Sequence, residues 1–299
     1  MLILHDPRCA EYGSAARPEQ PARVVKTAAH LRATHPDWEW RTPQGLADDA
    51  TLRLAHTPAH LERLTVARDF DGDTPFFAGI GDHARRAVTA AIEAAQYAVS
   101  TRKPAFSLMR PPGHHALSDK AMGFCYLNQI ALAALALQKG LGGGPQAAKV
   151  AIWDFDAHHG NGTEALLHGR DDDLFFASVH QYPGYPGSGT QDHGPHIRNW
   201  PVAPHTPRVD HMAALRASLD AVVSFAPDLI LVSAGFDAYA RDPITQMTLE
   251  REDFATLGRW LRETGRPAAA ILEGGYSEDL PLLVEAFLVT WDKRALSDA

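Results

Sequence analysis

The sequence has few of the features that mark secreted or membrane proteins. It contains two cysteines among 299 residues, Cys9 and Cys125, which are too few for a disulfide framework and fit a reducing compartment. No apolar run reaches the roughly 18 residues that cross a bilayer. The start of the chain, Met1 to Asp6, lacks a cationic segment followed by an apolar stretch. We therefore expect a cytoplasmic protein that does not associate with membranes.

The chain also has fewer positively than negatively charged residues. The chain has 28 Lys and Arg residues against 36 Asp and Glu residues, so its formal net charge is −8 and general binding to nucleic acid is not expected. The apolar content of 45% and the charged content of 21% are those of a folded globular protein. Histidine, by contrast, is abundant, with 16 residues. Many of them lie beside Gly, Pro or Asp, where a metal or acid/base site is to be sought.

Strand-like apolar segments alternate with segments of helical periodicity. Unbroken apolar strands such as Leu229 to Ser233 indicate burial on both faces of a parallel sheet. We predict an α/β fold of three layers, with a mainly parallel central sheet and helices on both faces. The predicted strands are Met1–Leu4, Ala105–Met109, Val150–Phe155, Leu174–Val179, Leu229–Ser233 and Ala268–Leu272, and the predicted helices are Ala22–Ala33, Ala59–Ala67, His83–Ser100, Gln129–Lys139, Met212–Phe225, Asp253–Glu263 and Leu280–Val289.

The chain offers no sign of a domain boundary. The one flexible stretch, Gly142 to Pro145, joins a predicted helix to a predicted strand within a few residues and is interpreted as a loop. We therefore expect residues 1–299 to form one domain.

Polar clusters follow the carboxyl ends of the predicted strands. Ligands of open parallel sheets bind at that edge, so these segments are expected to converge on one cleft. The five clusters are Arg110 to His115, Asp154 to His159, His180 to Gly189, Ala234 to Asp242, and Glu273 to Tyr276.

The second cluster has the composition of a metal site. Residues two apart at the end of a strand point to the same side, so Asp154, Asp156 and His158 would be presented together. Two carboxylates this close repel each other unless a cation lies near them. Taken alone, the pattern fits helix capping and packed histidines equally well. Asp237, directly after another apolar strand, offers a third ligand, and one imidazole with two carboxylates would leave a position open for water.

Two further clusters suggest acid/base chemistry. His114 and His115 follow a proline-stiffened loop, and two imidazoles beside a metal can divide proton transfer from charge stabilisation. Adjacent histidines are more often ordinary loop residues, so the pair gains weight only beside the other clusters. Tyr276 follows two glycines that permit a sharp turn, and its hydroxyl could hydrogen-bond a carbonyl oxygen as negative charge develops on it.

Taken together, these blocks resemble the histone deacetylase family of zinc amidohydrolases, which includes acetylpolyamine amidohydrolases. Every block occurs in order over about 170 residues, and a weaker match lies at Arg17-Pro18-Glu19. The matching segments are Arg110-Pro111-Pro112-Gly113-His114-His115-Ala116, Gly123-Phe124-Cys125, Asp154 to Thr163, Ser178-Val179-His180, Tyr185 to Gly189, Gly235-Phe236-Asp237, Asp242-Pro243 and Glu273-Gly274-Gly275-Tyr276.

The resemblance implies an arginase–deacetylase fold and a set of roles at the cleft. It implies one zinc ion per chain, with iron(II) as an alternative because Asp and His bind both. It also implies a structural potassium ion. The implied zinc ligands are Asp156, His158 and Asp237; the implied catalytic residues are His115 as general base and acid, His114 held by Asp154, and Tyr276; the implied channel walls are Gly123, Phe124 and Tyr185; and the implied potassium ligands are Asp154, Asp156, His158, Ser178 and Val179.

Two positions indicate which branch of the family and which substrates the sequence resembles. Asn161 stands where many members have an aspartate beside the second histidine, which is similar to the class II branch and should leave His115 less basic. Ile244 stands at the channel position where polyamine-selective members carry a glutamate. An apolar residue there cannot attract a cationic polyamine, so a polyamine substrate is less expected. Acidic residues at the rim, among Asp69, Asp71 and Asp73, could restore that preference.

The expected activity is removal of acetyl or other short acyl groups from lysine-like amines, and the expected partner is an acylated lysine or small acylated amine. Three alternatives stay open: an acetylpolyamine or other small-amide deacetylase, a binding module with little turnover, and a thiol hydrolase that uses Cys125 with His114. Arginase-like enzymes need a further carboxylate two residues after the metal-binding histidine, where this chain has Gly160. The sequence does not report the oligomeric state.

Overall fold

A fully parallel sheet of eight strands forms the centre of the computed structural model, which describes residues 1–141, 145–170 and 173–292. Residues 142–144 of the predicted loop Gly142 to Pro145 lie outside the described residues. All seven neighbouring strand pairs run parallel. The strands, in the spatial order β2-β1-β3-β8-β7-β4-β5-β6, are β2 (Glu39–Arg41), β1 (Leu2–Leu4), β3 (Ala105–Ser107), β8 (Ala268–Leu272), β7 (Leu229–Ala234), β4 (Val150–Asp154), β5 (Leu174–Gln181) and β6 (Ile197–Val202).

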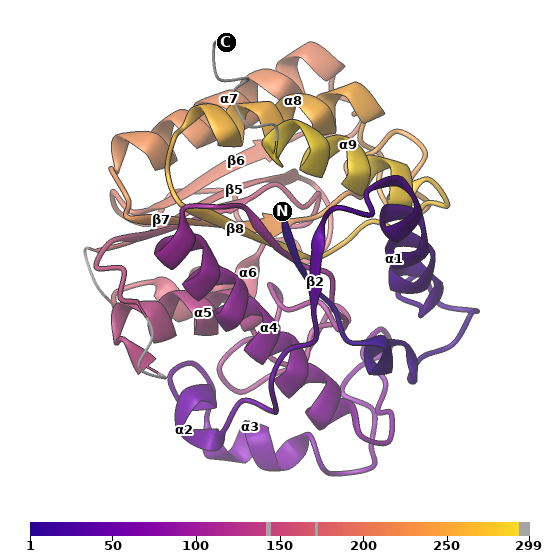
Figure 1. Ribbon diagram of the computed structural model, residues 1–299. Helices are drawn as coiled ribbons and strands as arrows, with labels where there is room; N and C mark the ends of the chain where they lie inside the picture. The colour runs from indigo at the N-terminus through magenta and orange to yellow at the C-terminus, as the bar shows by residue number, and fades with distance from the viewer. Residues whose placement is uncertain (142–144, 171–172, 293–299) are drawn as a thin grey trace.

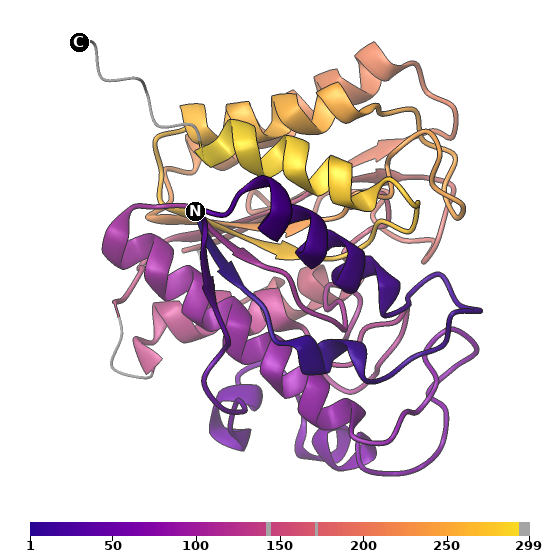
Figure 2. The same ribbon diagram turned by 45° about the vertical axis from the view of Figure 1, so that its right-hand side comes forward.

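Helices cover both faces of the sheet (Figure 1). One face carries α2 (Asp49–Leu52), α3 (Pro58–Arg63), α4 (Ile80–Thr101), α5 (Gln129–Gln138) and α6 (Asn161–Leu167). The other carries α1 (Ala22–Thr34), α7 (Arg208–Ser224), α8 (Arg251–Glu263) and α9 (Leu280–Asp292), as the rotated view in Figure 2 also shows. The predicted three-layer α/β fold is therefore confirmed. Within the described residues, each helix is too short or too polar to cross a membrane.

Burial explains which elements the sequence revealed. Every residue of β4, β7 and β8 is buried, so their apolar runs stood out. Helix α5 is likewise buried all round, because it packs between α4 on one side and β4 and β7 on the other. The two edge strands, β2 and β6, are partly exposed and mix polar with apolar residues, and the sequence analysis missed both.

Several predicted boundaries differ from the structure by a few residues, and two of the predicted elements are clearly too long. The helix predicted over Ala59–Ala67 ends at Arg63, whose guanidinium donates to the carbonyl oxygens of Val66 and Arg68 and closes a turn there. The strand predicted to reach Met109 ends at Ser107, where the chain leaves the sheet for the loop that carries the tandem histidines. In both cases contacts made by the following loop override the local apolar pattern.

The register of the sheet brings distant segments to one edge. Asp154, the last residue of β4, pairs with Ser178 of β5 on one side and with Ser233 of β7 on the other. Because the strands are parallel, the loops after them emerge at the same edge. Asp156, His158 and Asp237 therefore start from neighbouring strands.

The central strands are expected to contribute much of the stability. Leu231 in β7 is fully buried, so Leu231→Ala should lower the free energy of unfolding by about 2–5 kcal/mol through lost burial and a residual cavity. Urea denaturation measures this change. The control is Val209→Ala on α7, where the side chain is 72% exposed and the change should stay within about 0.5 kcal/mol. Equal effects of the two variants would contradict the assigned core.

Candidate metal centre and active site

Asp156, His158 and Asp237 form a group with the geometry of a metal site. One ligand atom from each lies within 4.8 Å of the others. The Nδ1 atom of His158 lies 3.2 Å from Oδ1 of Asp156 and 2.8 Å from Oδ2 of Asp237. Both carboxylates are fully buried. Two buried carboxylates and one imidazole are a donor set that zinc and iron(II) accept, so these residues fit the expected ion.

Backbone amides orient the carboxylates. The amide of Gly274 donates to Oδ2 of Asp156 at 2.7 Å, and the amide of Ala157 donates to Oδ1 of Asp237 at 2.8 Å. These bonds join the loops after β4, β7 and β8 and hold the aspartates in fixed rotamers. Hydrogen bonds that orient metal-binding side chains in this way affect how tightly a site binds its metal.

Glycines let the backbone approach these carboxylates closely. A Cβ added at Gly235 would clash with the carboxylate of Asp156, and one at Gly274 would clash with that of Asp237. Gly235 and Gly274 are therefore needed, because a side chain at either position would leave no room for the carboxylates of the candidate metal group.

The tandem histidines are held by different partners. Nδ1 of His114 lies 3.0 Å from Oδ2 of Asp154, whereas Nδ1 of His115 lies 2.8 Å from Oδ1 of Asn161. An amide oxygen only accepts hydrogen bonds, so Nδ1 of His115 carries the proton and Nε2 keeps its lone pair. His115 lines the channel described below, and the two imidazole rings lie 4.1 Å apart between centroids.

The surroundings separate the pKa values of the two imidazoles. Burial disfavours the charged form of His114, but Asp156 and Asp154 outweigh it and raise its pKa to about 10. Burial, together with His114 and His158, lowers the pKa of His115 well below its usual value. One imidazole is therefore suited to carry positive charge and the other to accept a proton.

Tyr276 is a protonated phenol held over the channel. Burial raises the pKa of this hydroxyl well above its usual value, so it remains a hydrogen-bond donor. Its amide donates to Oδ2 of Asp242 at 2.8 Å, and the guanidinium of Arg23 stacks on its ring at 4.7 Å. Arg23 also donates to the carbonyl oxygens of Glu273 and Gly275, which fixes the turn before the tyrosine.

The sequence analysis gave no role to Arg23 or to the Glu273 side chain. The Glu273 carboxylate is fully buried and accepts hydrogen bonds from the amides of Gly113, at 2.6 Å, and His114, at 3.2 Å. Burial raises the pKa of Glu273 to about 7. The only signal in the sequence was that Glu273, an ionisable residue, precedes the glycine turn. That signal does not show which backbone amides its carboxylate would bind.

A cavity of about 250 Å³ leads to the metal group. All five polar clusters predicted to converge reach this part of the molecule. The lining residues include the predicted channel positions Gly123, Phe124, Tyr185 and Ile244, together with His115, His158, Tyr276, Arg17, Pro18 and Asp73. The cavity is thus narrow and largely aromatic, with charged groups at two positions.

Three of the residues implied as potassium ligands lie on the adjacent strands β4 and β5. Asp154 and Ser178 are register partners on β4 and β5, and Val179 is the next residue of β5. The hydroxyl of Ser178 lies 2.9 Å from Nδ1 of His180, a residue of the matching segment to which no role was assigned from the sequence.

Cys125 differs from a catalytic thiol in its surroundings. Its side chain is fully buried, and burial raises its pKa well above the usual value. The thiol donates to the carbonyl oxygen of Gly123. This environment keeps the thiol protonated and disfavours the thiol-hydrolase alternative.

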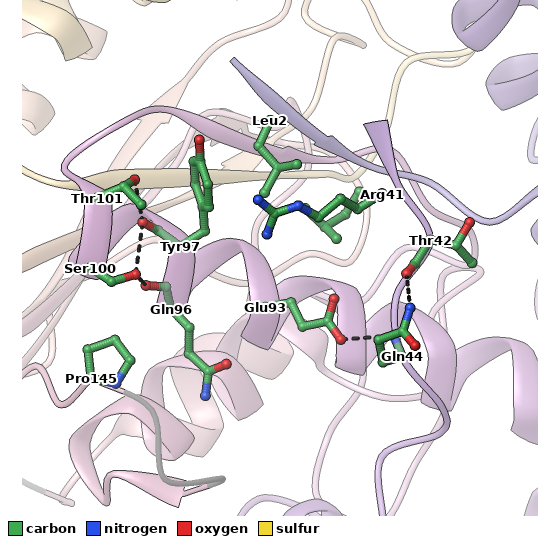
Figure 3. Close-up of a pocket in the computed structure, with 11 residues that line it drawn as sticks. Leu2, Arg41, Thr42, Gln44, Glu93, Gln96, Tyr97, Ser100, Thr101 and Pro145 are labelled. Carbon is green, nitrogen blue, oxygen red and sulfur yellow. Dashed lines mark hydrogen bonds between the residues drawn. The ribbon is translucent and has the colours of Figure 1, made fainter. Parts of the chain in front are cut away.

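A larger cavity of about 710 Å³ lies apart from the metal group, between β1, β2 and α4 (Figure 3). Its wall is polar and includes Arg41, Glu93, Gln96 and Tyr97. Glu93 accepts a hydrogen bond from the amide of Gln44. The metal-ligating group and the tandem histidines lie elsewhere, so the smaller cavity is the candidate active site.

Comparison with known proteins agrees with this geometry. Residues 17–288 match the family model of the histone deacetylase domain. The chain is 35% identical over 288 residues to the histone deacetylase-like amidohydrolase of Pseudomonas aeruginosa, covering 90% of this chain and 74% of that protein. It is 37% identical over 220 residues to acetylpolyamine amidohydrolase 1 of the same organism, covering 70% and 61%.

Solved structures show the same likeness. The crystal structure of an acetylpolyamine aminohydrolase from Burkholderia pseudomallei superimposes with a TM-score of 0.83 at 26% identity, covering 97% of this chain and 98% of that one. The eight-stranded parallel sheet with helices on both faces is that of the arginase–deacetylase α/β fold. Within that class, the chain belongs to the histone deacetylase family of deacetylases and amidohydrolases.

Gly235 provides a test of the metal group. In Gly235→Ala the added methyl group would displace the Asp156 carboxylate, so zinc affinity should fall by about 10- to 100-fold. Competition with a chromophoric chelator measures the affinity. Gly72→Ala is the control, because a Cβ there meets open space and zinc affinity should not change. Unchanged affinity in both variants would show that Asp156 is not a ligand.

Proposed function

We propose that this protein is a zinc-dependent deacetylase that hydrolyses the amide of acetylated or otherwise short-chain acylated lysine-like amines. The observation that carries the proposal is the convergence of Asp156, His158 and Asp237 beside an oriented histidine pair and the Tyr276 phenol at the cavity wall. The family membership supports the reaction class.

Zinc, held by those three residues, would supply Lewis acidity toward water and the amide carbonyl. His115 accepts a proton from the attacking water at Nε2, since its Nδ1 is committed to Asn161. The phenol of Tyr276 donates a hydrogen bond to the amide oxygen as negative charge develops there. His114, paired with Asp154, holds positive charge beside the reacting atoms. His115 then returns its proton to the leaving amine, and a carboxylate is released.

The channel favours a slender acyl-amine chain. Tyr185 packs edge-on against His115, with ring centroids 5.2 Å apart, and Phe124 packs against Tyr276 at 5.8 Å. Rings in this arrangement bury methylene groups and exclude branched side chains. Ile244 adds apolar surface and no charge at the wall.

A structural potassium ion is part of the proposal. The carbonyl oxygens of Asp154, Asp156, His158 and Val179 with the Ser178 hydroxyl are its proposed ligands, which would tie β4 to β5 directly behind the zinc ligands. Oxygen donors of this kind suit a hard monovalent cation.

A second candidate is an acetylpolyamine deacetylase. The observation in its favour is the likeness to acetylpolyamine amidohydrolase 1 of Pseudomonas aeruginosa and to the Burkholderia pseudomallei structure. The apolar Ile244 at the channel wall favours the lysine-like substrate instead. A binding module with little turnover is less favoured, because the metal ligands, both histidines and the phenol are all present at the cavity.

The test is acetate release by protein of defined zinc content, with acetyl-lysine peptides, acetylated polyamines and longer acyl analogues as substrates. We expect turnover that a chelator abolishes and zinc restores. Tyr276→Phe should lower kcat by about 100- to 1,000-fold through loss of one oxyanion donor. The control is Tyr182→Phe, which alters a partly exposed phenol outside the cavity. Substrate binding without acetate release would favour the binding module.

Asn161 gives a separate prediction on pH dependence. The carboxylate of Asn161→Asp would stabilise the protonated form of His115 and raise its pKa. A base with a higher pKa stays protonated to higher pH, so the acid limb of the kcat/KM profile should shift to higher pH. A pH–rate profile of both proteins measures the shift. An unmoved acid limb would argue against His115 as the base.

A further inference from the structure

The mouth of the channel carries one cationic and one anionic side chain. Among the residues that line the cavity, Arg17 and Asp73 are the charged groups outside the metal and histidine cluster. They come from separate loops, one before α1 and the other before α4. Everything else in the channel wall is aromatic, aliphatic or glycine, so these two groups set the charge preference at the entrance.

The acidic rim loop contributes one carboxylate to the cavity. Oδ1 of Asp71 accepts hydrogen bonds from the amides of Asp73 and Thr74, and Oδ1 of Asp69 accepts one from the amide of Phe76. These two aspartates therefore hold the loop together. Asp73 is the member that faces the cavity.

The same loop is tied to the channel wall. The hydroxyl of Thr74 accepts a hydrogen bond from the amide of Phe124 at 3.2 Å, and Thr74 is fully buried. Asp73, the preceding residue, is therefore presented from an anchored backbone. A positioned group pays less entropy on binding a ligand than a mobile one.

Arg17 is fastened beside Asp73. Its Nη1 atom donates to the carbonyl oxygen of Gly72 at 3.1 Å, which places the guanidinium next to the residue that precedes Asp73. Among the described residues, neither Arg17 nor Asp73 forms an ion pair within 4.0 Å. The entrance thus presents a cation and an anion side by side, each with capacity to bind a ligand.

We propose that the preferred substrate is a free amino acid acylated on its side-chain amine, such as Nε-acetyl-lysine with unblocked α-ammonium and α-carboxylate groups. The inference rests on the proposed function and names its substrate class. The α-carboxylate pairs with Arg17 and the α-ammonium with Asp73, while the methylene chain runs between Phe124 and Tyr185 to the metal group.

The charges at the entrance separate this substrate from its rivals. An acetylated polyamine carries cationic charge only, which Asp73 attracts and Arg17 repels. A lysine within a peptide has neither a free α-carboxylate nor a free α-ammonium, so both charged groups would lose their partners. The zwitterionic head of a free amino acid is the one of the three that complements both.

The experiment compares three substrates of equal chain length with the zinc-loaded full chain. They are Nε-acetyl-lysine, Nε-acetyl-lysine amide, which lacks the negative charge, and N-acetylcadaverine, which lacks the carboxylate altogether. We expect kcat/KM for acetate release to be at least about tenfold higher for the free amino acid than for the other two, and this preference to weaken as salt is added.

Variants of Arg17 identify the origin of the preference. Arg17→Gln should remove it by lowering kcat/KM for Nε-acetyl-lysine alone, with the other substrates changed by less than about twofold. Arg17→Glu should reverse it in favour of N-acetylcadaverine, a gain that a misfolded protein would not show. The matched control is Arg68→Gln, which removes an exposed positive charge from the same rim outside the cavity and should preserve the preference.

The outcomes distinguish this inference from the proposed function. Wild-type protein that cleaves all three substrates equally, or prefers N-acetylcadaverine or the amide, would overturn the substrate assignment and leave the deacetylase proposal standing. The same holds if Arg17→Gln lowers activity on all three substrates alike. No acetate from these compounds or from an acetyl-lysine peptide would overturn the proposed function itself, and the substrate assignment with it.

Discussion

The close approach of two buried aspartates at the carboxyl edge of the sheet is the constraint on which the site depends. Asp156 and Asp237 converge on one imidazole, and both carboxylates are buried away from bulk solvent, which would otherwise screen their charge. Such a pair is stable only with a cation or protons nearby. Hydrogen bonds from the amides of Gly274 and Ala157 hold the two carboxylates in place. The lack of side chains at Gly235 and Gly274 leaves room for them.

The same edge gives two adjacent imidazoles different chemistry. His114 and His115 are neighbours in sequence and in space, and their partners differ by one functional group, a carboxylate on Asp154 and an amide on Asn161. Burial acts on both, so the nearby carboxylates decide which ring takes a second proton and becomes positively charged. The candidate metal group and the histidine pair therefore lie on loops that directly follow the central strands, whereas the charges at the channel entrance lie on the loops before α1 and α4.

Much of the fold and of the site could be predicted because the relevant signals are local. The buried strands β4, β7 and β8 are continuous apolar runs, and a run buried on both faces has few other interpretations. Strand alternation suggested that Asp154, Asp156 and His158 lie together, although β4 ends at Asp154 and the other two residues lie in the loop after it. The order of the polar blocks carried the likeness to the family, so the candidate metal ligands, the histidine pair and Tyr276 were named before their distances were known.

By itself, then, the sequence determined the layered fold, the edge at which the site lies and the residue types that carry its chemistry, since each depends on periodicity or short spacing. The tertiary structure alone decided that Glu273 holds the amides of Gly113 and His114, that Arg23 stacks on Tyr276, and that Arg17 meets the loop of Asp73. These contacts join residues tens to hundreds of positions apart. Their formation depends on the paths of loops, which no local pattern encodes.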